Sequence, residues 1–179
     1  MLAARPERGE HLLVYQTATT HRALPETLKR LGVPARVYGL RRDLTADVVD
    51  GSVTYRPFGE ARFIDDLRTA RAVVAGGGFT LLSEAVFLRK PVLSVPVERQ
   101  FEQVLNALYL EELGYGSYAR RLDDAALEAF LAHVPDHERA LAGYAQEGNG
   151  VALATVKEQL AAVAARRAGR SRRPAGGAA

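Results

Sequence analysis

The sequence predicts an α/β domain built on a doubly wound, six-stranded parallel sheet. Short apolar segments alternate with amphipathic, helix-like segments over most of the 179 residues. The strand candidates are apolar throughout instead of alternating with polar residues, which is typical of parallel strands covered by helices on both faces. A chain of this length accommodates one ordinary domain, so a large multidomain enzyme is excluded.

The first half of the chain predicts three strands and two helices. Residues 11–16, His-Leu-Leu-Val-Tyr-Gln, form a short run with β-branched and aromatic character. Residues 20–31 predict a helix, with Pro25 in its first turns and Gly32 after its end. The other elements of this half are strands at residues 35–40 and 52–56 and a helix at residues 63–70.

The second half repeats this alternation. Residues 72–75, Ala-Val-Val-Ala, read as a buried strand that ends in three consecutive glycines. The helix predicted next, at residues 80–89, is closed by Lys90-Pro91, because proline cannot continue a helix. The remaining elements are strands at residues 91–95 and 116–120 and helices at residues 98–113, 123–132 and 151–165.

Charge and composition divide the chain into three parts. Residues 1–10 are linker-like, residues 11–165 are expected to form the binding domain, and residues 166–179 read as a disordered basic tail. Five arginines of the tail follow the last acidic residue, Glu158, and without them 19 basic residues face 21 acidic ones. The overall charge of +3 therefore belongs to the tail, and nucleic acid is not an expected partner.

Several classes of protein are excluded by what the sequence lacks. It has no cysteine, which excludes disulfides, thiolate metal sites and thiol nucleophiles. It has no apolar run long enough to span a bilayer, and its charged N-terminus is unlike a secretory signal, so we expect a cytoplasmic protein. No Asp-x-Asp pair is present, and Pro135 is expected to break the helix between His133 and His137, so no metal or cofactor is expected.

The glycines at residues 76–78, followed by Phe79-Thr80, are the first candidate binding site. They join a buried strand to a helix, at the edge of the sheet where α/β proteins bind ligands. Glycine lets a ligand approach the backbone, the free N–H groups of the first helical turn favour an anion, and Thr80 is a candidate N-cap. The spacing matches neither G-x-G-x-x-G nor a P-loop, so a simple turn without a ligand stays an alternative.

Polar residues in the following helices are further candidates. Glu84, one turn beyond the glycines, could accept hydrogen bonds from a vicinal diol, or could merely stabilise the helix dipole. Glu102 and Gln103, with Asn106 one turn on, offer acceptors and donors that suit a polyol. A solvated helix face is the alternative for these three residues.

Taken together, these segments resemble a known family. The similarity rests on residues 76–85 (Gly-Gly-Gly-Phe-Thr-Leu-Leu-Ser-Glu-Ala), 90–96 (Lys-Pro-Val-Leu-Ser-Val-Pro), 101–103 (Phe-Glu-Gln) and 106–107 (Asn-Ala). The order resembles the C-terminal, donor-binding half of GT-B fold UDP-glycosyltransferases of the family 28 and UDP-glucuronosyltransferase types. Within that group it is most similar to an uncharacterised prokaryotic branch. The resemblance implies a Rossmann-like fold.

The resemblance also implies a role for each matching position. It assigns the donor diphosphate to Gly77, Gly78, Phe79, Thr80, Leu81, Gln16 and Thr17. It assigns the ribose to Glu84, the uracil to Pro57 and Phe58, and the transferred sugar to Glu102, Gln103 and Asn106. It names no catalytic residue and no metal ligand in this chain.

The expected function is therefore the UDP-sugar-binding half of a glycosyltransferase that moves a hexose or N-acetylhexosamine to an acceptor hydroxyl. Enzymes of this type have a second, N-terminal half that holds the acceptor and the usual base. That half, or a partner subunit, is an expected partner, and through it an acceptor at the inner membrane face. Alone, this chain is expected to bind the donor but to be inactive. The alternatives are a non-catalytic donor-binding subunit, a UDP-sugar 2-epimerase-like enzyme and an α/β domain without nucleotide binding.

Overall fold

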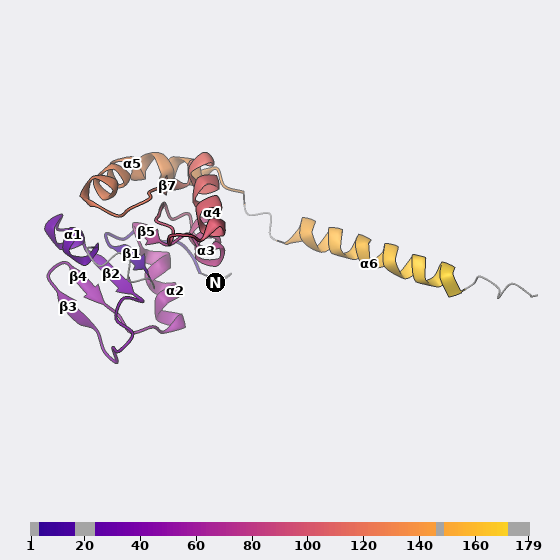
Figure 1. Ribbon diagram of the computed structural model, residues 1–179, viewed down its shortest axis with the longest axis horizontal. Helices are drawn as coiled ribbons and strands as arrows, with labels where there is room; N and C mark the ends of the chain where they lie inside the picture. The colour runs from indigo at the N-terminus through magenta and orange to yellow at the C-terminus, as the bar shows by residue number, and fades with distance from the viewer. Residues whose placement is uncertain (1–3, 17–23, 146–148, 172–179) are drawn as a thin grey trace, which may run out of the picture. The chain divides into compact units, whose positions relative to one another are not determined.

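The structure is a computed structural model that describes residues 4–16, 24–145 and 149–171. The chain divides into two units, Met1–Tyr144 and Ala145–Ala179. The first unit contains the sheet and five helices among its described residues, and the second contains one helix (Figure 1).

The sheet confirms the predicted α/β class and adds one strand to it. Within the described residues it has seven strands in the order β3-β4-β2-β1-β5-β6-β7. Their bounds are β1 Leu12–Tyr15, β2 Ala35–Tyr38, β3 Val48–Asp50, β4 Val53–Tyr55, β5 Ala72–Ala75, β6 Val92–Ser94 and β7 Gly116–Tyr118. The added strand β3 is antiparallel to β4, across a turn in which Gly51 has a φ of 62°. All other pairings are parallel.

The central strand β1 divides the sheet into two halves. Leu12 of β1 is in register with Ala35 of β2 on one side and with Ala72 of β5 on the other. The chain first builds outward from β1 through β2 to β4, and then returns to add β5, β6 and β7 on the opposite side. In open α/β sheets, ligands bind beyond the carboxyl ends of the strands, where the direction of winding reverses. Here that place lies between β1 and β5.

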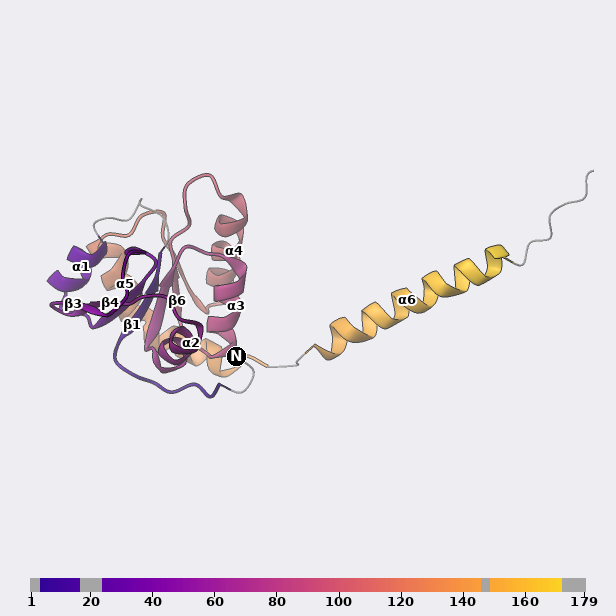
Figure 2. The ribbon, with the colours of Figure 1, turned by 90° about the horizontal axis from the view of Figure 1, so that it is seen from below.

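Helices cover both faces of the sheet, as Figure 2 shows. The helices α1 (Leu24–Arg30) and α5 (Asp124–Ala142) pack on one face with the buried side chains of Leu12 and Val14. On the other face, α2 (Glu60–Thr69), α3 (Phe79–Phe87) and α4 (Phe101–Glu112) pack with Leu13 and Val73. Neighbouring residues of one strand point to opposite faces, so both must be apolar. This explains why the strands lack polar alternation.

Helix α5 corrects the prediction that Pro135 breaks the helix. The helix runs through Pro135 to Ala142, ten residues beyond the predicted end. Proline removes one backbone hydrogen bond from a helix interior, but Phe130, Val134 and Leu141 are buried on both sides of it. Their burial outweighs the local cost. The start of the helix is fixed by Asp123, whose Oδ1 accepts a hydrogen bond from the Ala126 N–H at 2.9 Å.

A buried carboxylate ties α2 to the β2–β4 half of the sheet. The side chain of Asp66 is 1% exposed and accepts hydrogen bonds from Arg36 at 2.5 Å, from Arg56 at 2.6 Å and from the Tyr38 hydroxyl at 2.5 Å. The imidazole Nε2 of His11 also lies 3.0 Å from the Asp66 carbonyl oxygen. One acidic residue thus joins two strands to the helix that covers them.

The N-terminal residues expected to be linker-like pack against this unit where the structure describes them. The Glu7 N–H donates to the Arg68 carbonyl at 2.9 Å, and the Gly9 N–H donates to the Thr69 carbonyl at 3.0 Å. Lys90, which is 4% exposed, donates from Nζ to the carbonyl oxygens of Glu7 and Ala70. These contacts connect residues 7–9 to the end of α2 and to the segment before β6.

Burial lowers the pKa of Lys90 to about 8. Lysine in an unfolded chain has a pKa of about 10.4, so between these values the unfolded chain binds more protons and stability must rise with pH. Between about pH 8 and pH 10, we expect the free energy of unfolding of the wild type to rise by up to about 2 kcal/mol more than that of Lys90→Met. Urea unfolding of both proteins measures this difference. For the exposed Lys157→Met variant, the free energy of unfolding should change with pH as it does in the wild type. If the wild type rises as much relative to Lys157→Met as it does relative to Lys90→Met, the assignment to Lys90 is contradicted.

The second unit contains helix α6 (Gly150–Ser171), which is longer than predicted. Residues 166–171, expected to belong to a disordered tail, are helical, because alanine and arginine both favour helix. The sheet-containing unit ends at Tyr144, and α6 belongs to the second unit, Ala145–Ala179. The described side chains of α6 are exposed.

No helix within the described ranges is both long and apolar enough to cross a membrane.

Candidate functional site

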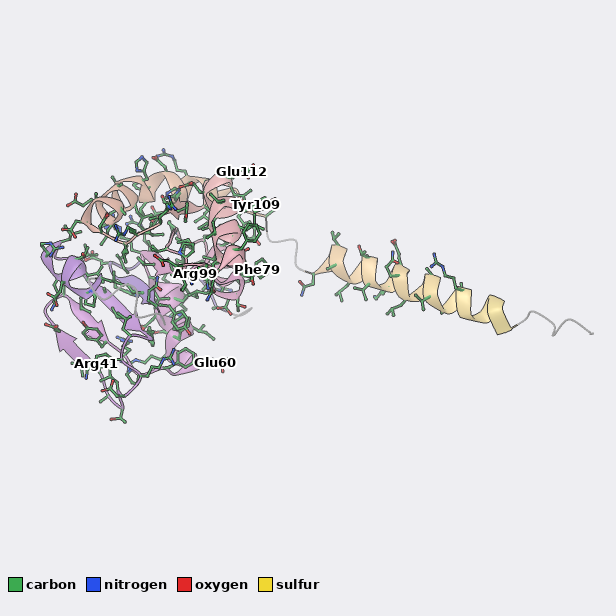
Figure 3. All side chains as sticks on the ribbon, viewed as in Figure 1. Arg41, Glu60, Phe79, Arg99, Tyr109 and Glu112 are labelled. Carbon is green, nitrogen blue, oxygen red and sulfur yellow. The ribbon has the colours of Figure 1, made fainter. Side chains whose placement is uncertain are left out.

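A cavity of about 570 Å³ lies at the carboxyl ends of the central strands. Its wall is formed by the ends of β1 and β5, by the starts of α2, α3 and α4, and by the segments that join these helices to the sheet. Glu60 and Phe79, both labelled in Figure 3, contribute from α2 and α3. The volume is within the range of small-molecule sites, roughly 300–1,000 Å³.

Most of the residues predicted for a binding site meet in this cavity. Those that line it are Gln16, Phe58, Gly78, Phe79, Thr80, Leu81, Glu84, Glu102 and Gln103. Gly77, Pro57 and Asn106 are not on its wall, and Thr17 lies outside the described residues. Tyr15, Glu60 and Val97 also line it, within strand-end segments to which no individual role was assigned from the sequence, and Phe63 and Ile64 of α2 line it without having been predicted. In the sequence, only the position of these residues could have indicated a place in the site, because each lies at or shortly after a strand end or in the first turns of α2.

The glycine turn between β5 and α3 has a backbone conformation at Gly77 that other residues rarely adopt. Gly77 has a φ of 94°, and a Cβ added to it would lie 2.8 Å from the Gln103 carbonyl oxygen and 3.0 Å from Ser94 Oγ. Asn106 donates from Nδ2 to the Gly77 carbonyl at 3.1 Å. Asn106, which was predicted to contact a polyol, therefore holds the turn through this hydrogen bond. Gly77, which does not line the cavity, likewise shapes the turn.

The start of α3 lies on the cavity wall, and its first N–H groups have no partner within the helix and no side-chain cap among the described residues. The N-cap is Gly78 and not Thr80, and no side chain caps the helix. The first backbone hydrogen bond of the helix runs from the Leu82 N–H to the Gly78 carbonyl at 3.2 Å. The N–H groups of Phe79, Thr80 and Leu81 precede it, and all three residues line the cavity. Such a helix N-terminus favours a negatively charged group.

Two buried polar atoms beside this turn have no hydrogen-bond partner among the described residues. Gln16, at the end of β1, is 1% exposed and its Nε2 is unpaired, and Ser94, at the end of β6, is fully buried with an unpaired Oγ. An unsatisfied buried polar atom costs about 1–3 kcal/mol, so native proteins rarely leave one without a ligand, ion or water. Sequence reasoning missed Ser94, although a serine inside the apolar run Pro-Val-Leu-Ser-Val was a visible signal.

The charged side chains on the cavity wall are all carboxylates among the described residues. Glu60, Glu84 and Glu102 line it, and no lysine, arginine or histidine does so among the described residues. Burial raises the pKa of Glu84, and Glu60 adds to the shift. Within the described part of the chain, the Glu84 carboxylate has neither a hydrogen-bond donor nor a cation as partner. An anionic ligand would thus be held by backbone N–H groups, and ligand hydroxyls could donate to the carboxylates.

Gln103 faces the cavity but is also engaged within the protein. Its Oε1 accepts a hydrogen bond from the Val97 N–H at 3.1 Å, and its Nε2 donates to Gln100. These bonds shape the segment that leads from β6 into α4. Gln103 can therefore meet a ligand only with its remaining hydrogen-bonding capacity.

An exposed aromatic ring stands at the cavity beyond β4. Phe58 is 69% exposed, and its ring lies 5.7 Å from that of Phe63 and 6.5 Å from that of Tyr38. The buried rings of Phe63 and Tyr38 pack against the Phe58 ring and leave part of its surface exposed. A planar heterocycle can stack on such a surface.

The two histidines that have metal-ligand spacing are engaged with protein groups. The Nε2 atom of His137 lies 3.1 Å from Ser117 Oγ, and its Nδ1 atom lies 2.8 Å from the Gly114 carbonyl oxygen. His133 lies 2.8 Å from the Ala129 carbonyl. The described ranges contain no cluster of three metal-ligating side chains.

The known proteins to which this chain is similar are glycosyltransferases. Residues 1–135 match the family described as glycosyl transferase family 1. An uncharacterized glycosyltransferase of Methanosarcina mazei is 42% identical over 59 residues, which are 31% of this chain and 16% of that protein. A UDP-N-acetylglucosamine--N-acetylmuramyl-(pentapeptide) pyrophosphoryl-undecaprenol N-acetylglucosamine transferase of Bacillus cereus is 36% identical over 75 residues, 37% of this chain and 21% of that protein.

Solved structures share the fold at low identity. The glycotransferase of kitacinnamycin has a TM-score of 0.60 at 18% identity, over 78% of this chain and 39% of that one. Os79 from O. sativa, in complex with UDP, has a TM-score of 0.60 at 19% identity, over 77% of this chain and 37% of that one. The fold is thus the Rossmann-like fold of one half of a GT-B glycosyltransferase. The chain spans less than two fifths of these solved proteins and about a fifth of the curated relatives.

Proposed function

Because this chain belongs to glycosyl transferase family 1, we propose that its first unit binds the nucleotide-sugar donor of a glycosyl transfer reaction. The proposed donor is a UDP-sugar, bound in the cavity between β1, β5 and the starts of α2, α3 and α4. The proposed reaction moves a hexose or N-acetylhexosamine to an acceptor hydroxyl without a bound metal ion. UDP is bound in the similar structure of Os79, which supports the choice of nucleotide.

The observation that carries this proposal is the combination of unpaired donors and unpaired acceptors in one cavity. The open start of α3 and the unpaired Gln16 Nε2 are donors for a diphosphate. The Glu84 carboxylate is an acceptor that suits the two hydroxyls of a ribose, and the Phe58 ring suits the base. Glu102 lies at the start of α4, where it can accept hydrogen bonds from sugar hydroxyls.

The part of this chain in catalysis is then electrostatic. As the bond between the sugar and the diphosphate breaks, negative charge grows on the departing diphosphate. Backbone N–H groups fixed by the Gly77 turn can stabilise that charge without moving. We propose that the acceptor and the general base belong to another domain or to a partner subunit. This agrees with the share of the similar proteins that the chain spans.

Calorimetric titration with UDP-glucose tests the donor site. We expect micromolar binding to the wild type and a loss of about tenfold or more in Glu84→Gln, because the neutral amide is a weaker acceptor for the ribose hydroxyls. Lowering the pH from about 8 to 5 should weaken binding to the wild type, since protonation removes the acceptor and the pKa of Glu84 is raised. Glu84→Gln should show a flatter pH profile.

The exposed Glu112→Gln variant on α4, outside the cavity, is the matched control and should bind like the wild type. GDP-glucose, titrated in parallel, tests the preference for uracil. If a folded wild-type protein binds none of these nucleotides, the donor-site proposal is wrong for this chain in isolation.

A further inference from the structure

A second cavity, of about 540 Å³, lies beside the donor cavity at the ends of β6 and β7. We call it the arginine groove and define it by Val97, Glu98, Arg99, Tyr118, Arg120 and Arg121. Arg99, which is labelled in Figure 3, follows β6 in the chain, and the other two arginines follow β7. Val97 lines both cavities, so they flank the same segment between β6 and α4.

The three arginines of the groove differ from most others in this unit because no carboxylate pairs with them. Among the described residues, the arginines that form ion pairs are Arg8, Arg30, Arg36, Arg41, Arg56, Arg62, Arg68 and Arg139. Within the part of the chain that the structure describes, no such pair and no side-chain hydrogen bond involves Arg99, Arg120 or Arg121. Their guanidinium groups are exposed and available to a ligand.

The charge and donor geometry of the groove suit a phosphate group. Three guanidinium groups and the Glu98 carboxylate give the wall a net charge of about +2, equal and opposite to that of a phosphate monoester dianion. Each guanidinium presents five N–H donors in a planar fork that fits phosphate oxygens. The Tyr118 hydroxyl is a further donor on the wall.

The backbone of Arg99 is a second unusual feature of the groove. Arg99 has a φ of 65°, in a region that non-glycine residues rarely adopt. Arg89, with a φ of 54°, lies just after Leu88, the C-cap of α3, where helices commonly end in this conformation. Arg99 instead lies before α4, within the turn closed by the Gln100 N–H to the Val97 carbonyl. A glycine would relieve the strain, but it would remove the guanidinium from the groove.

We propose that the arginine groove is a second anion site that binds a phosphate group, separate from the donor cavity. The phosphate can belong to a soluble phosphorylated molecule or to a phospholipid headgroup, since both present the same oxygens. This inference goes beyond the proposed donor site and does not depend on it.

Inorganic pyrophosphate is the first probe. It is titrated by calorimetry into the whole chain with saturating UDP, in about 0.15 M salt, where surface charges are screened over roughly 8 Å. We expect Arg99→Gln, Arg120→Gln and Arg121→Gln each to weaken pyrophosphate binding about fivefold or more. Arg42→Gln, which removes an equally exposed and unpaired arginine elsewhere, should change it less than about twofold.

Vesicles distinguish the two sources of the phosphate. Co-sedimentation is measured with vesicles of phosphatidylcholine alone and of phosphatidylcholine mixed with phosphatidylglycerol. Binding of pyrophosphate alone supports a soluble ligand. Binding of the anionic vesicles supports a headgroup, provided that the triple glutamine variant loses it. Thermal unfolding of each variant confirms that the fold is intact.

The proposal is overturned if the wild type binds neither probe, or if the groove variants bind as Arg42→Gln does. Because UDP-glucose and pyrophosphate are measured separately, the two proposals fail independently. Loss of UDP-glucose binding in Glu84→Gln concerns the donor cavity, and loss of pyrophosphate binding in the arginine variants concerns the groove.

Discussion

Replacing Gly77 by alanine is expected to destabilise the first unit by about 2–4 kcal/mol and to abolish donor binding. Alanine at a φ of 94° is strained, and its Cβ would lie 2.8 Å from a backbone oxygen, that of Gln103. The turn or the start of α4 must therefore move. For a unit of this size we expect the thermal midpoint to fall by roughly 5–15 °C. Calorimetric unfolding and a UDP-glucose titration measure both effects.

The adjacent Gly78→Ala variant separates stability from binding. Nothing lies within 4 Å of a Cβ at Gly78, and its backbone angles, φ −63° and ψ 130°, are accessible to any residue. The thermal midpoint should hence stay within about 2 °C of the wild type. Because Gly78 lines the cavity, the added methyl group should still weaken donor binding. Equal midpoints for the two variants would refute the role given to the Gly77 turn.

Replacing Asp66 by alanine is expected to cost about 3–5 kcal/mol of stability, enough to unfold a marginal domain. The substitution leaves Arg56, whose side chain is 14% exposed, without its main counterion, and it removes the acceptor of the buried Tyr38 hydroxyl. The attachment of α2 to β2 and β4 is lost with it. Urea unfolding of the wild type and the variant gives the difference in free energy.

Asp65→Ala is the matched control, since it removes the same side chain from the preceding position. Asp65 is exposed and pairs with Arg68 on the surface, where such pairs contribute about 1 kcal/mol or less. We expect Asp65→Ala to stay within that limit. A cost for Asp66→Ala no greater than that for Asp65→Ala would show that the buried cluster does not hold α2 to the sheet.

The class of fold could be predicted because the strands are buried on both faces. Leu12, Leu13 and Val14 must all be apolar when helices cover both sides of β1, and that pattern is visible without a structure. Strand β3 was missed because it is three residues long, lies at the edge and is mostly exposed. The length of α5 was underestimated because its local signal, Pro135, is overridden by the burial of residues far away in sequence.

The candidate site could be predicted in part for a similar reason. In a parallel sheet the strand ends gather at one edge, so the glycines after Ala75 were expected to lie where a ligand binds. What the sequence could not provide was the direction of each side chain. Asn106 and Gln103 have the residue types of a polyol site, but they bond to Gly77 and Val97 within the protein. The arginine groove depends on two loops whose proximity only the folded sheet reveals.

The central place of β1 has a consequence for the order in which the chain is made. Of the strands of this sheet, β1 is made before β2 and β5, so it can pair with β2 while its other edge stays open until Ala72–Ala75 has been added. Until then the edge of β1 that pairs with β5 in the folded sheet has no partner strand, and the side chains of Leu12–Val14 on that strand are all apolar. Such an edge is a template for aggregation. Pairing of β1 on both sides is therefore complete only after the residues of β5, Ala72–Ala75, have been made.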